Sequence, residues 1–208
     1  MFYPIHLNLK DKRVVVIGGG PVAERKVESL LGTGASIQVI SPTVTDRLES
    51  LAQSNQIRLE RRVYEPGDCK GATLVFSATD DSLASDAVFE EATEVRALVN
   101  TADQPALCDF IMPAVVRRGD IAIAISTGGT SPGLAAQLRQ KIGQIIGPEY
   151  AEFARLLARV RPEIRRRLPD VEERKALQYR ILNSDIMDRL RQNDREGAER
   201  RLWEIIES

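Results

Sequence analysis

The sequence predicts an α/β protein: a doubly wound parallel sheet, then a small mixed α+β region, then a helical end. Three observations carry this prediction. Short apolar runs rich in Val and Ile alternate with helical patterns through the first half of the chain, as they do in parallel sheets. The alternation then gives way to a hairpin pattern, and the remainder has the pattern of helices alone. We therefore expect domains over residues 1–113, 114–147 and 148–208.

The strands and helices of the first half follow from these runs. The first run, Val-Val-Val-Ile over 14–17, suits a strand that is buried on both faces. Helices are expected over 24–31, where Gly32 and Gly34 end the pattern, and over 81–96. The expected strands cover residues 14–17, 36–40, 57–63, 73–78 and 97–101.

The second half begins with a hairpin. Apolar residues over 114–117 and 121–126 flank an Arg-Gly-Asp turn, which favours two antiparallel strands. A helix is expected from Pro132 to about residue 146, capped by Thr130 or Ser131. Further helices are expected over 149–160, 171–182, 186–190 and 195–206.

The turn after the first expected strand fits a dinucleotide-binding fingerprint, which makes the predicted sheet Rossmann-like. Gly18 permits the tight turn, Gly20 lets a pyrophosphate approach the backbone, and Ala23 allows the helix to pack closely on the strand. Pro21 lies at the helix start, where its missing N–H costs little. The N-terminus of that helix would hold the phosphates. The alternative interpretation is a tight turn with no ligand.

The type of dinucleotide stays open at this point. The fingerprint expects an acidic residue about twenty residues further on, to bind the ribose 2′-hydroxyl. The second expected strand instead ends at Ser41-Pro42-Thr43, with neither a carboxylate nor an arginine at its tip. The nearest candidates are Asp46 and Arg47. Spacing alone therefore does not choose between NAD and NADP.

Four loops are expected to converge on one edge of the sheet. They follow the carboxyl ends of strands, where ligands bind in open α/β sheets, and they cover residues 18–22, 41–43, 78–80 and 100–103. A second glycine-rich turn, 127–132, precedes a capped helix and is a further candidate anion site. The alternative for this turn is ordinary helix-start chemistry.

Composition excludes several classes of function. The chain has 29 Lys and Arg against 30 Asp and Glu, a formal net charge of −1, which argues against nucleic-acid and membrane partners. Cys69 and Cys108 form neither a disulfide framework nor a metal-ligand spacing, and His6 is the single histidine, so no metal site is expected. The pattern contains no signal peptide or membrane span, and a cytoplasmic protein is expected.

Six segments, taken in order, resemble one enzyme family. They are Tyr3-Pro4-Ile5, the stretch from Gly18 to Lys26, Ala78-Thr79-Asp80, Asn100-Thr101-Ala102-Asp103, Phe110-Ile111-Met112-Pro113-Ala114 and Ser126-Thr127-Gly128-Gly129-Thr130-Ser131-Pro132. Together they are similar to the precorrin-2 dehydrogenase and sirohydrochlorin ferrochelatase family, the amino-terminal module of siroheme synthase. The resemblance is close over residues 1–150 and looser beyond them.

The resemblance implies a function in siroheme and porphyrin biosynthesis: the NAD-dependent oxidation of the tetrapyrrole precorrin-2 to sirohydrochlorin. It also implies a homodimer whose subunits are joined through a dimerisation region after the nucleotide domain. One alternative is a bifunctional enzyme that also inserts Fe²⁺ into sirohydrochlorin. An alternative of another class is a non-catalytic NAD-sensing Rossmann module.

The resemblance also implies roles for individual residues. Asp103 is the implied acid/base, which would accept the proton that leaves when the hydride is transferred; the alternative is a polar residue that closes a turn. The residues implied for cofactor binding are Gly18, Gly19, Gly20, Pro21, Val22, Ser41, Pro42, Thr43, Ala78, Thr79 and Asp80. Those implied for substrate binding, with backbone donors from the turn at 128–130, are Asn100, Ser126, Thr127, Gly128, Gly129 and Thr130. Candidate counter-charges for the substrate carboxylates, or else solvated surface charges, are Arg117, Arg118, Arg139 and Lys141.

Overall fold

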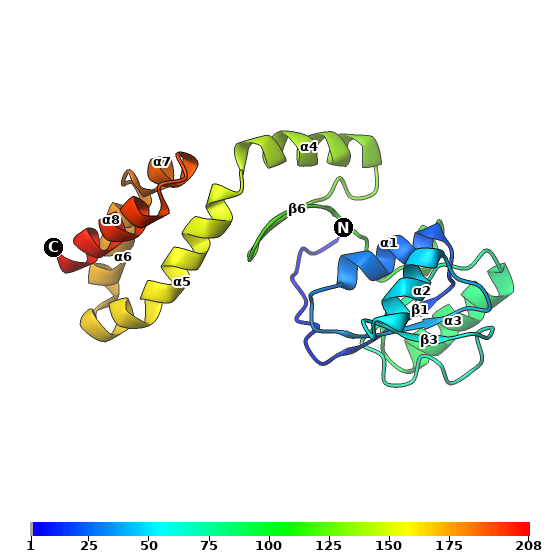
Figure 1. The fold of residues 1–208 in the computed structure, drawn as a ribbon. Coiled ribbons are helices and arrows are strands. Elements are labelled where there is room, and N and C mark those ends of the chain that lie inside the picture. The colour runs from blue at the N-terminus through cyan, green and yellow to red at the C-terminus, as the bar shows by residue number, and fades with distance from the viewer. Residues whose placement is uncertain (1) are drawn as a thin grey trace. The chain divides into compact units, whose positions relative to one another are not determined.

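The computed structural model describes residues 2–208, and contacts divide the chain into two compact units, Met1–Met112 and Pro113–Ser208. The first unit is built on a five-stranded sheet with helices packed against it (Figure 1). Its strands are β1 (Arg13–Ile17), β2 (Ser36–Ile40), β3 (Arg58–Glu60), β4 (Leu74–Ser77) and β5 (Leu98–Thr101). Its helices are α1 (Pro21–Leu30), α2 (Asp46–Gln53) and α3 (Ser82–Glu94), with the short 3₁₀ helix η1 at Pro105–Leu107.

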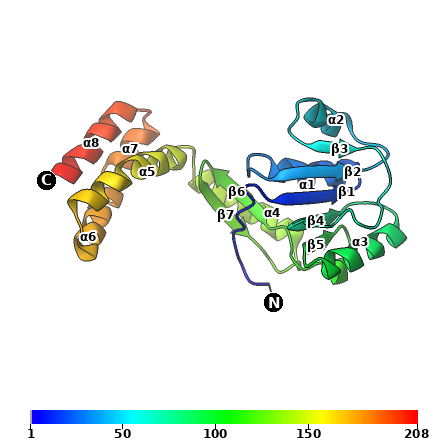
Figure 2. The same cartoon turned by 90° about the horizontal axis from the view of Figure 1, so that it is seen from below.

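The five strands lie in the order β3-β2-β1-β4-β5, and every neighbouring pair is parallel (Figure 2). In the central strand β1, Val16 pairs with Val39 of β2 on one side and with Phe76 of β4 on the other. The chain moves outward through β2 and β3 and then returns to the opposite side of β1. The strand order therefore reverses beside β1, and ligands bind at the carboxyl ends of the strands at such a point. The predicted doubly wound sheet is confirmed.

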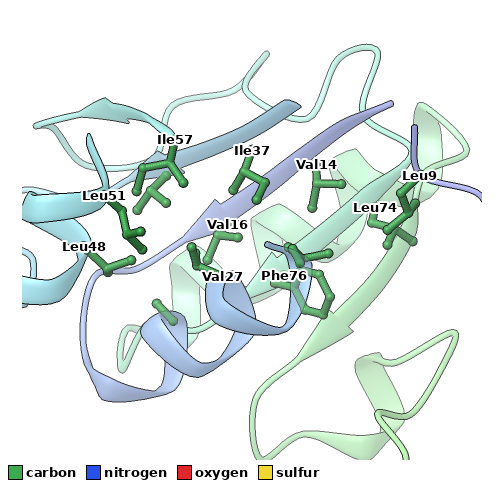
Figure 3. Packing of buried hydrophobic residues seen from close by; sticks show 13 residues of the cluster. Leu9, Val14, Val16, Val27, Ile37, Leu48, Leu51, Ile57, Leu74 and Phe76 are labelled. Atoms are coloured by element: carbon green, nitrogen blue, oxygen red, sulfur yellow. The ribbon is translucent and has the colours of Figure 1, made fainter. Parts of the chain in front are cut away.

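Buried clusters lie on both faces of this sheet. Val14 and Val16 of β1 belong to a cluster with Val27 of α1, and Figure 3 shows these side chains gathered between helix and sheet. The alternate residue of β1, Val15, belongs to a second cluster with Val88 of α3. Because successive side chains point to opposite faces of a strand, an uninterrupted β-branched run is what a strand covered on both faces requires.

Capping side chains set the starts of two helices in the first unit. The carboxylate of Asp81 accepts hydrogen bonds from the N–H groups of Leu83 (2.9 Å) and Ala84 (3.2 Å) and begins α3. The hydroxyl of Thr45 accepts from the N–H of Leu48 (3.3 Å) and begins α2. Such caps satisfy backbone donors that have no partner inside the helix.

The segment between β2 and β4 differs from the sequence prediction in two ways. The third strand is expected over 57–63, but β3 ends at Glu60, after which the guanidinium of Arg62 binds both Glu60 (2.6 Å) and Asp68 (2.6 Å). No helix is expected between the second and third strands, yet α2 forms there. Leu48 and Leu51 explain this helix, because both are buried in the cluster beneath it.

The second unit begins with the expected hairpin, β6 (Ala114–Arg118) paired with β7 (Ile121–Ile125) in antiparallel register. The helix α4 (Pro132–Ile145) follows. Ser131 is its cap, since the hydroxyl accepts a hydrogen bond from the N–H of Leu134 at 3.2 Å. Proline at the first helical position suits this start.

Four helices around one apolar cluster form the rest of the second unit: α5 (Glu149–Arg167), α6 (Val171–Leu182), α7 (Ile186–Arg191) and α8 (Arg195–Glu207). The sequence predicts that the first of them ends at residue 160, but α5 continues through Pro162 to Arg167. Val160 and Ile164, on either side of the proline, are both buried in the cluster. Burial of this face outweighs the hydrogen bond that proline removes. None of the helices within residues 2–208 is long and apolar enough to cross a membrane.

Candidate functional site at the carboxyl edge of the sheet

The loop after β1 is built around Gly18. This residue has a left-handed φ of +113°, and a β-carbon on it would overlap the carbonyl group of Ala78 at the end of β4. Backbone hydrogen bonds fix the turn, because the N–H of Gly18 donates to the carbonyl of Ile40 (2.9 Å) and the N–H of Ala78 donates to that of Ile17 (2.7 Å). Both the conformation and the close approach require glycine at this position.

Gly19 holds the same loop against the end of β2. A β-carbon on Gly19 would overlap the carbonyl oxygen of Thr43 and lie 2.8 Å from Ser41 Oγ. The hydroxyl of Ser41 donates to that carbonyl oxygen (2.7 Å), and the N–H of Thr45 donates to the carbonyl of Gly19 (3.0 Å). The loops after β1, β2 and β4 therefore lie together, as the sequence predicts.

Gly20 begins α1 beside open space. Apart from Gly20 itself and its two chain neighbours, no heavy atom of residues 2–208 lies within 4 Å of the place where its β-carbon would stand. No side chain in this described range caps the helix, and Pro21 has no N–H to satisfy. The first turn of α1, from Val22 onward, thus offers backbone N–H groups and the positive end of the helix dipole next to a space that a side chain would otherwise fill. This arrangement fits a dinucleotide pyrophosphate.

The tip of β2 carries hydroxyl groups and no carboxylate. Ser41 is buried, and its hydroxyl is used within the loop, as described above. The arginine nearest to it in the sequence, Arg47, is ion-paired with Glu28 at 3.2 Å, and both side chains are about half exposed. The tip of β2 itself thus presents Pro42 and Thr43, and the adjacent strand β3 ends beside it at Glu60, whose carbonyl accepts from the N–H of Ser41 at 3.0 Å.

Asp103 lies in the turn after β5. Its side chain is exposed, and its backbone has a left-handed φ of +57°, a conformation that Asp and Asn adopt more readily than other non-glycine residues. The N–H of Ala102 donates to the carbonyl of Ser77 (2.8 Å) and joins this turn to the end of β4. The residue expected to be the acid/base thus stands on the same sheet edge as the loop that starts at Ala78.

Asn100 and Cys108 tie this turn back to β5. The side chain of Asn100 is buried, and its amide donates to the carbonyl of Phe110 at 2.9 Å. The thiol of Cys108 accepts a hydrogen bond from the N–H of Thr101 and donates to the carbonyl of Gln104, both at 3.3 Å. Asn100, expected to bind substrate, therefore has its amide engaged with the backbone of its own chain.

Lys26 of α1 also reaches this edge, a contact that the sequence pattern does not predict. Its ammonium group donates to Asn100 Oδ1 at 2.9 Å and lies 5.5 Å from the centroid of the Phe76 ring. Burial lowers the pKa of Lys26 below its ordinary value of 10.5, against the opposing influence of Cys108 and Asp103. A lysine within a helical pattern gives no sign of such a contact, because lysine side chains mostly extend into solvent.

The glycine-rich turn of the second unit is stabilised by its own hydrogen bonds. Gly128 and Gly129 have left-handed φ angles of +66° and +87°. The N–H of Gly128 donates to Ser126 Oγ (3.0 Å), and that of Thr130 donates to the carbonyl of Thr127 (3.2 Å). Two of the three backbone donors expected to bind substrate therefore already have partners within the turn. Among residues 2–208, the N–H of Gly129 alone of these three has no acceptor.

Arg118 serves the structure of the second unit. Its guanidinium donates to the carbonyl oxygens of Ile146 and Gly143, both at 2.9 Å. These carbonyls lie at the end of α4, where the helix itself supplies no donors. Arg118 is thus a helix-capping side chain, and the expectation that it is a free counter-charge for a substrate is wrong.

Three family models match consecutive parts of the chain. Residues 5–114 match the family described as "Putative NAD(P)-binding". Residues 118–145 match "Sirohaem biosynthesis protein central", and residues 149–206 match "Sirohaem synthase dimerisation region". The first model covers the parallel sheet and its edge loops, and the third covers most of the α5–α8 cluster.

Curated proteins named siroheme synthase are similar to this chain along its length. The one from Pseudomonas fluorescens (strain SBW25) is 38% identical over 205 residues, which are 99% of this chain and 44% of that protein. The one from Methylococcus capsulatus (strain ATCC 33009 / NCIMB 11132 / Bath) is 38% identical over 207 residues, 100% of this chain and 44% of that protein. The chain therefore spans less than half the length of these relatives.

A solved structure described as "SirC, precorrin-2 dehydrogenase" is also similar. Its sequence is 26% identical, its TM-score is 0.78, and the match covers 99% of each chain. The sequence matches and this structural match thus both extend over the two units of the chain. This chain belongs to the NAD(P)-binding family whose model covers residues 5–114, and it continues into the sirohaem synthase central and dimerisation regions.

Proposed function

We propose that this chain oxidises precorrin-2 to sirohydrochlorin, with NAD⁺ as the electron acceptor. The observation that carries the proposal is the likeness to the solved precorrin-2 dehydrogenase, which covers 99% of both chains at a TM-score of 0.78. This likeness includes the second unit, so it is more specific than a shared nucleotide-binding sheet, a fold that serves many functions. A non-catalytic NAD sensor would need to resemble only the first unit.

Bound NAD⁺ would supply the acceptor for a hydride, and the protein would supply binding and orientation. The loop Gly18–Val22 and the first turn of α1 bind the pyrophosphate beside the open space at Gly20. The segment Ser41–Thr43 borders the adenosine ribose, and Ala78–Asp80 borders the nicotinamide ribose. The uncharged tip of β2 and the existing ion pair of Arg47 favour NAD⁺ over NADP⁺.

Asp103 accepts the proton in the proposed reaction. The oxidation removes a hydride and a proton from precorrin-2, so the products are sirohydrochlorin, NADH and H⁺. The exposed carboxylate of Asp103 suits this role because it stands on the sheet edge that also carries the nucleotide loops. It would take the proton from the ring and release it to water. A positioned group of this kind typically contributes about 10²–10⁴-fold to the rate.

The substrate is a polycarboxylate, which binds N–H and hydroxyl donors. In the second unit, the N–H of Gly129, which has no acceptor within residues 2–208, and the hydroxyl of Ser126 are donors of this type. The hydroxyl of Thr127 already donates to the carbonyl of Ser131 at 3.1 Å, so Thr127 is proposed to border the substrate, while Gly128 and Thr130 shape the turn. In the first unit, Asn100 lies at the base of the loop that contains Asp103, and because its carboxamide is already bound to Lys26 and to the carbonyl of Phe110, it is proposed to border the substrate. Each of these two groups, taken within its own unit, is a proposed contact region for the tetrapyrrole.

The helices of the second unit are proposed to form a homodimer. The match of residues 149–206 to a dimerisation region supports this assembly. Separate matches over 118–145 and 149–206 also support a division of the second unit near residue 147, into a central region and a helical domain. Light scattering on the purified chain would measure the mass of the assembly, and a monomer at all concentrations would contradict the proposal. The cytoplasmic location stays a prediction.

An anaerobic assay with precorrin-2 tests the proposed reaction. With NAD⁺ we expect sirohydrochlorin and NADH to form in equal amounts, and with NADP⁺ a slower reaction. A sample without nucleotide measures the spontaneous oxidation of the substrate. A rate with either nucleotide no faster than this control would contradict the proposal.

A further inference from the structure

The half-buried side chain of Lys26 has no part in the proposed reaction. It extends from α1 to β5, where the ammonium group donates to Asn100 Oδ1 at 2.9 Å and lies 5.5 Å from the centre of the Phe76 ring. Removing a charge from water is unfavourable. Packing against Phe76 does not explain why the residue is charged. An apolar side chain would cover the Phe76 ring equally well, and its burial would not remove the water that surrounds an ammonium group.

Asn100 connects Lys26 to the turn that contains Asp103. One side of its carboxamide accepts from Lys26, and the other donates to the carbonyl of Phe110 at 2.9 Å. The backbone of Asn100 also forms an isolated antiparallel bridge with Cys108. This bridge closes the intervening residues into a loop, so Asn100 lies at the base of the loop and Asp103 lies within it.

The conformation of Asp103 depends on how firmly that base is held. A left-handed backbone at a non-glycine residue, here φ +57°, is strained and persists only where the surroundings hold it. Inside the loop, the thiol of Cys108 binds the N–H of Thr101 at 3.3 Å. Lys26 adds a contact from outside the loop, because it comes from α1.

We propose that Lys26 is a positioning residue for Asp103. Its ammonium group holds the amide of Asn100, and Asn100 holds the loop that presents the carboxylate of Asp103. The inference rests on the proposed function, because it concerns the same proton transfer. Lys26 itself does not touch the reacting atoms.

Steady-state kinetics of Lys26→Met and Lys26→Arg test this role. Methionine matches the four-atom apolar stem of lysine but lacks the ammonium group at its end, whereas arginine keeps a charged donor. For Lys26→Met we expect kcat to fall at least about tenfold, because a small displacement of a catalytic group has effects of this size. The Kd for NAD⁺ should stay within about twofold, and any rise in the KM for precorrin-2 should be smaller than the fall in kcat, because Lys26 acts through Asn100. Lys26→Arg keeps a charged donor and should retain kcat within about threefold.

The matched control is Lys12→Met, which removes an exposed lysine next to the amino end of β1. It should leave kcat and KM unchanged. Two results would overturn the inference. One is an unchanged kcat in Lys26→Met, and the other is a rise in KM without a fall in kcat, which would make Lys26 a direct substrate contact.

Amide hydrogen exchange of the full chain separates this inference from the proposed function, since it needs no substrate. In Lys26→Met we expect faster exchange over residues 101–108 and unchanged exchange in α3. If the wild-type chain does not oxidise precorrin-2, the proposed function fails, and faster exchange would still show that Lys26 holds the loop. Unchanged exchange over 101–108 would show that it does not, and would overturn the inference.

Discussion

Gly18 and Ala78 directly follow two different strands, β1 and β4, yet the backbone of Ala78 occupies the space that a side chain on Gly18 would need. Gly18 also has a left-handed φ of +113°. For Gly18→Ala we therefore expect the free energy of unfolding of the first unit to fall by about 2 kcal/mol, from strain and overlap together. The affinity for NAD⁺ should fall with it, because the phosphate loop loses its shape.

The signal chosen to monitor unfolding decides which unit is observed. The single tryptophan, Trp203, lies in α8 and packs on the helical cluster of the second unit. In Gly18→Ala, faster hydrogen exchange in β1 and β4 should show the reduced stability of the first unit. Tryptophan fluorescence should show the unfolding of the second unit, with its midpoint unchanged from the wild type. A lower midpoint measured by fluorescence, together with unchanged hydrogen exchange in β1 and β4, would contradict the prediction.

Gly20 provides the opposite case. A β-carbon there meets open space, and its φ of −80° is ordinary for any residue. We expect Gly20→Ala to change the stability of the chain by less than about 0.5 kcal/mol. Its affinity for NAD⁺ should fall at least about tenfold, or about 1.4 kcal/mol, because the methyl group would take the space next to the pyrophosphate. Isothermal titration with NAD⁺ measures this, and wild-type affinity would show that the pyrophosphate lies elsewhere.

Asp103 is best tested with asparagine, which tolerates the left-handed backbone at this position. Asp103→Asn removes the charge and the proton acceptor while it keeps the shape of the side chain. We expect kcat for precorrin-2 oxidation to fall by about 10² or more, with the Kd for NAD⁺ unchanged. Asp103→Ala is the companion variant. If Asp103→Asn is as active as the wild type, Asp103 is a turn residue and not the proton acceptor.

Asp68 predicts a dependence of stability on pH. Burial alone would raise the pKa of its carboxyl, but hydrogen bonds from Arg62 and the N–H of Glu65 lower it below its usual 3.8. A carboxyl with a lowered folded-state pKa stabilises the fold above its unfolded pKa, and this stability is lost as the pH falls through the folded-state pKa. We expect Asp68→Asn to reduce stability by about 2 kcal/mol at neutral pH.

The difference in unfolding free energy between the wild type and Asp68→Asn should shrink as the pH falls below about 3.8. Urea unfolding followed by circular dichroism at several pH values measures it. The exposed pair of Arg47 and Glu28 is the comparison. Glu28→Gln should change stability by less than about 1 kcal/mol, because exposed ion pairs contribute little. A difference for Asp68→Asn that stays constant to low pH would contradict the prediction.

Much of the fold could be predicted from the sequence because the responsible signals are local. The β-branched run over 14–17, the glycine turn behind it and the caps at Asp81 and Ser131 each act over a few residues. Two elements depend instead on partners distant in the chain. Helix α2 forms because Leu48 and Leu51 pack in the apolar cluster on the sheet. Helix α5 continues past Pro162 because residues on both sides of the proline are buried.

The candidate site also has one part that could be predicted from the sequence and one part that could not. The loops at the carboxyl ends of the strands could be located, because parallel strands place them on one edge. The contact between Lys26 and Asn100 could not be predicted, since it depends on how α1 packs against the sheet and on a buried amide at the end of β5. The internal hydrogen bonds of the turn at Gly128 could not be predicted either. A glycine-rich turn has the same sequence whether its N–H groups bind acceptors within the turn or remain available to a ligand.

The position of β1 between β2 and β4 has a consequence for the newly made chain. During synthesis, β2 and β3 are complete before β4 emerges, so the backbone N–H and C=O groups on one edge of β1 have no partner strand until then. Such an edge is a template for wrong pairing with other chains. The phosphate loop acquires its final shape only when Ala78 arrives beside Gly18. A nucleotide can therefore stabilise only those chains in which both halves of the sheet have already joined, and its binding selects for completed molecules.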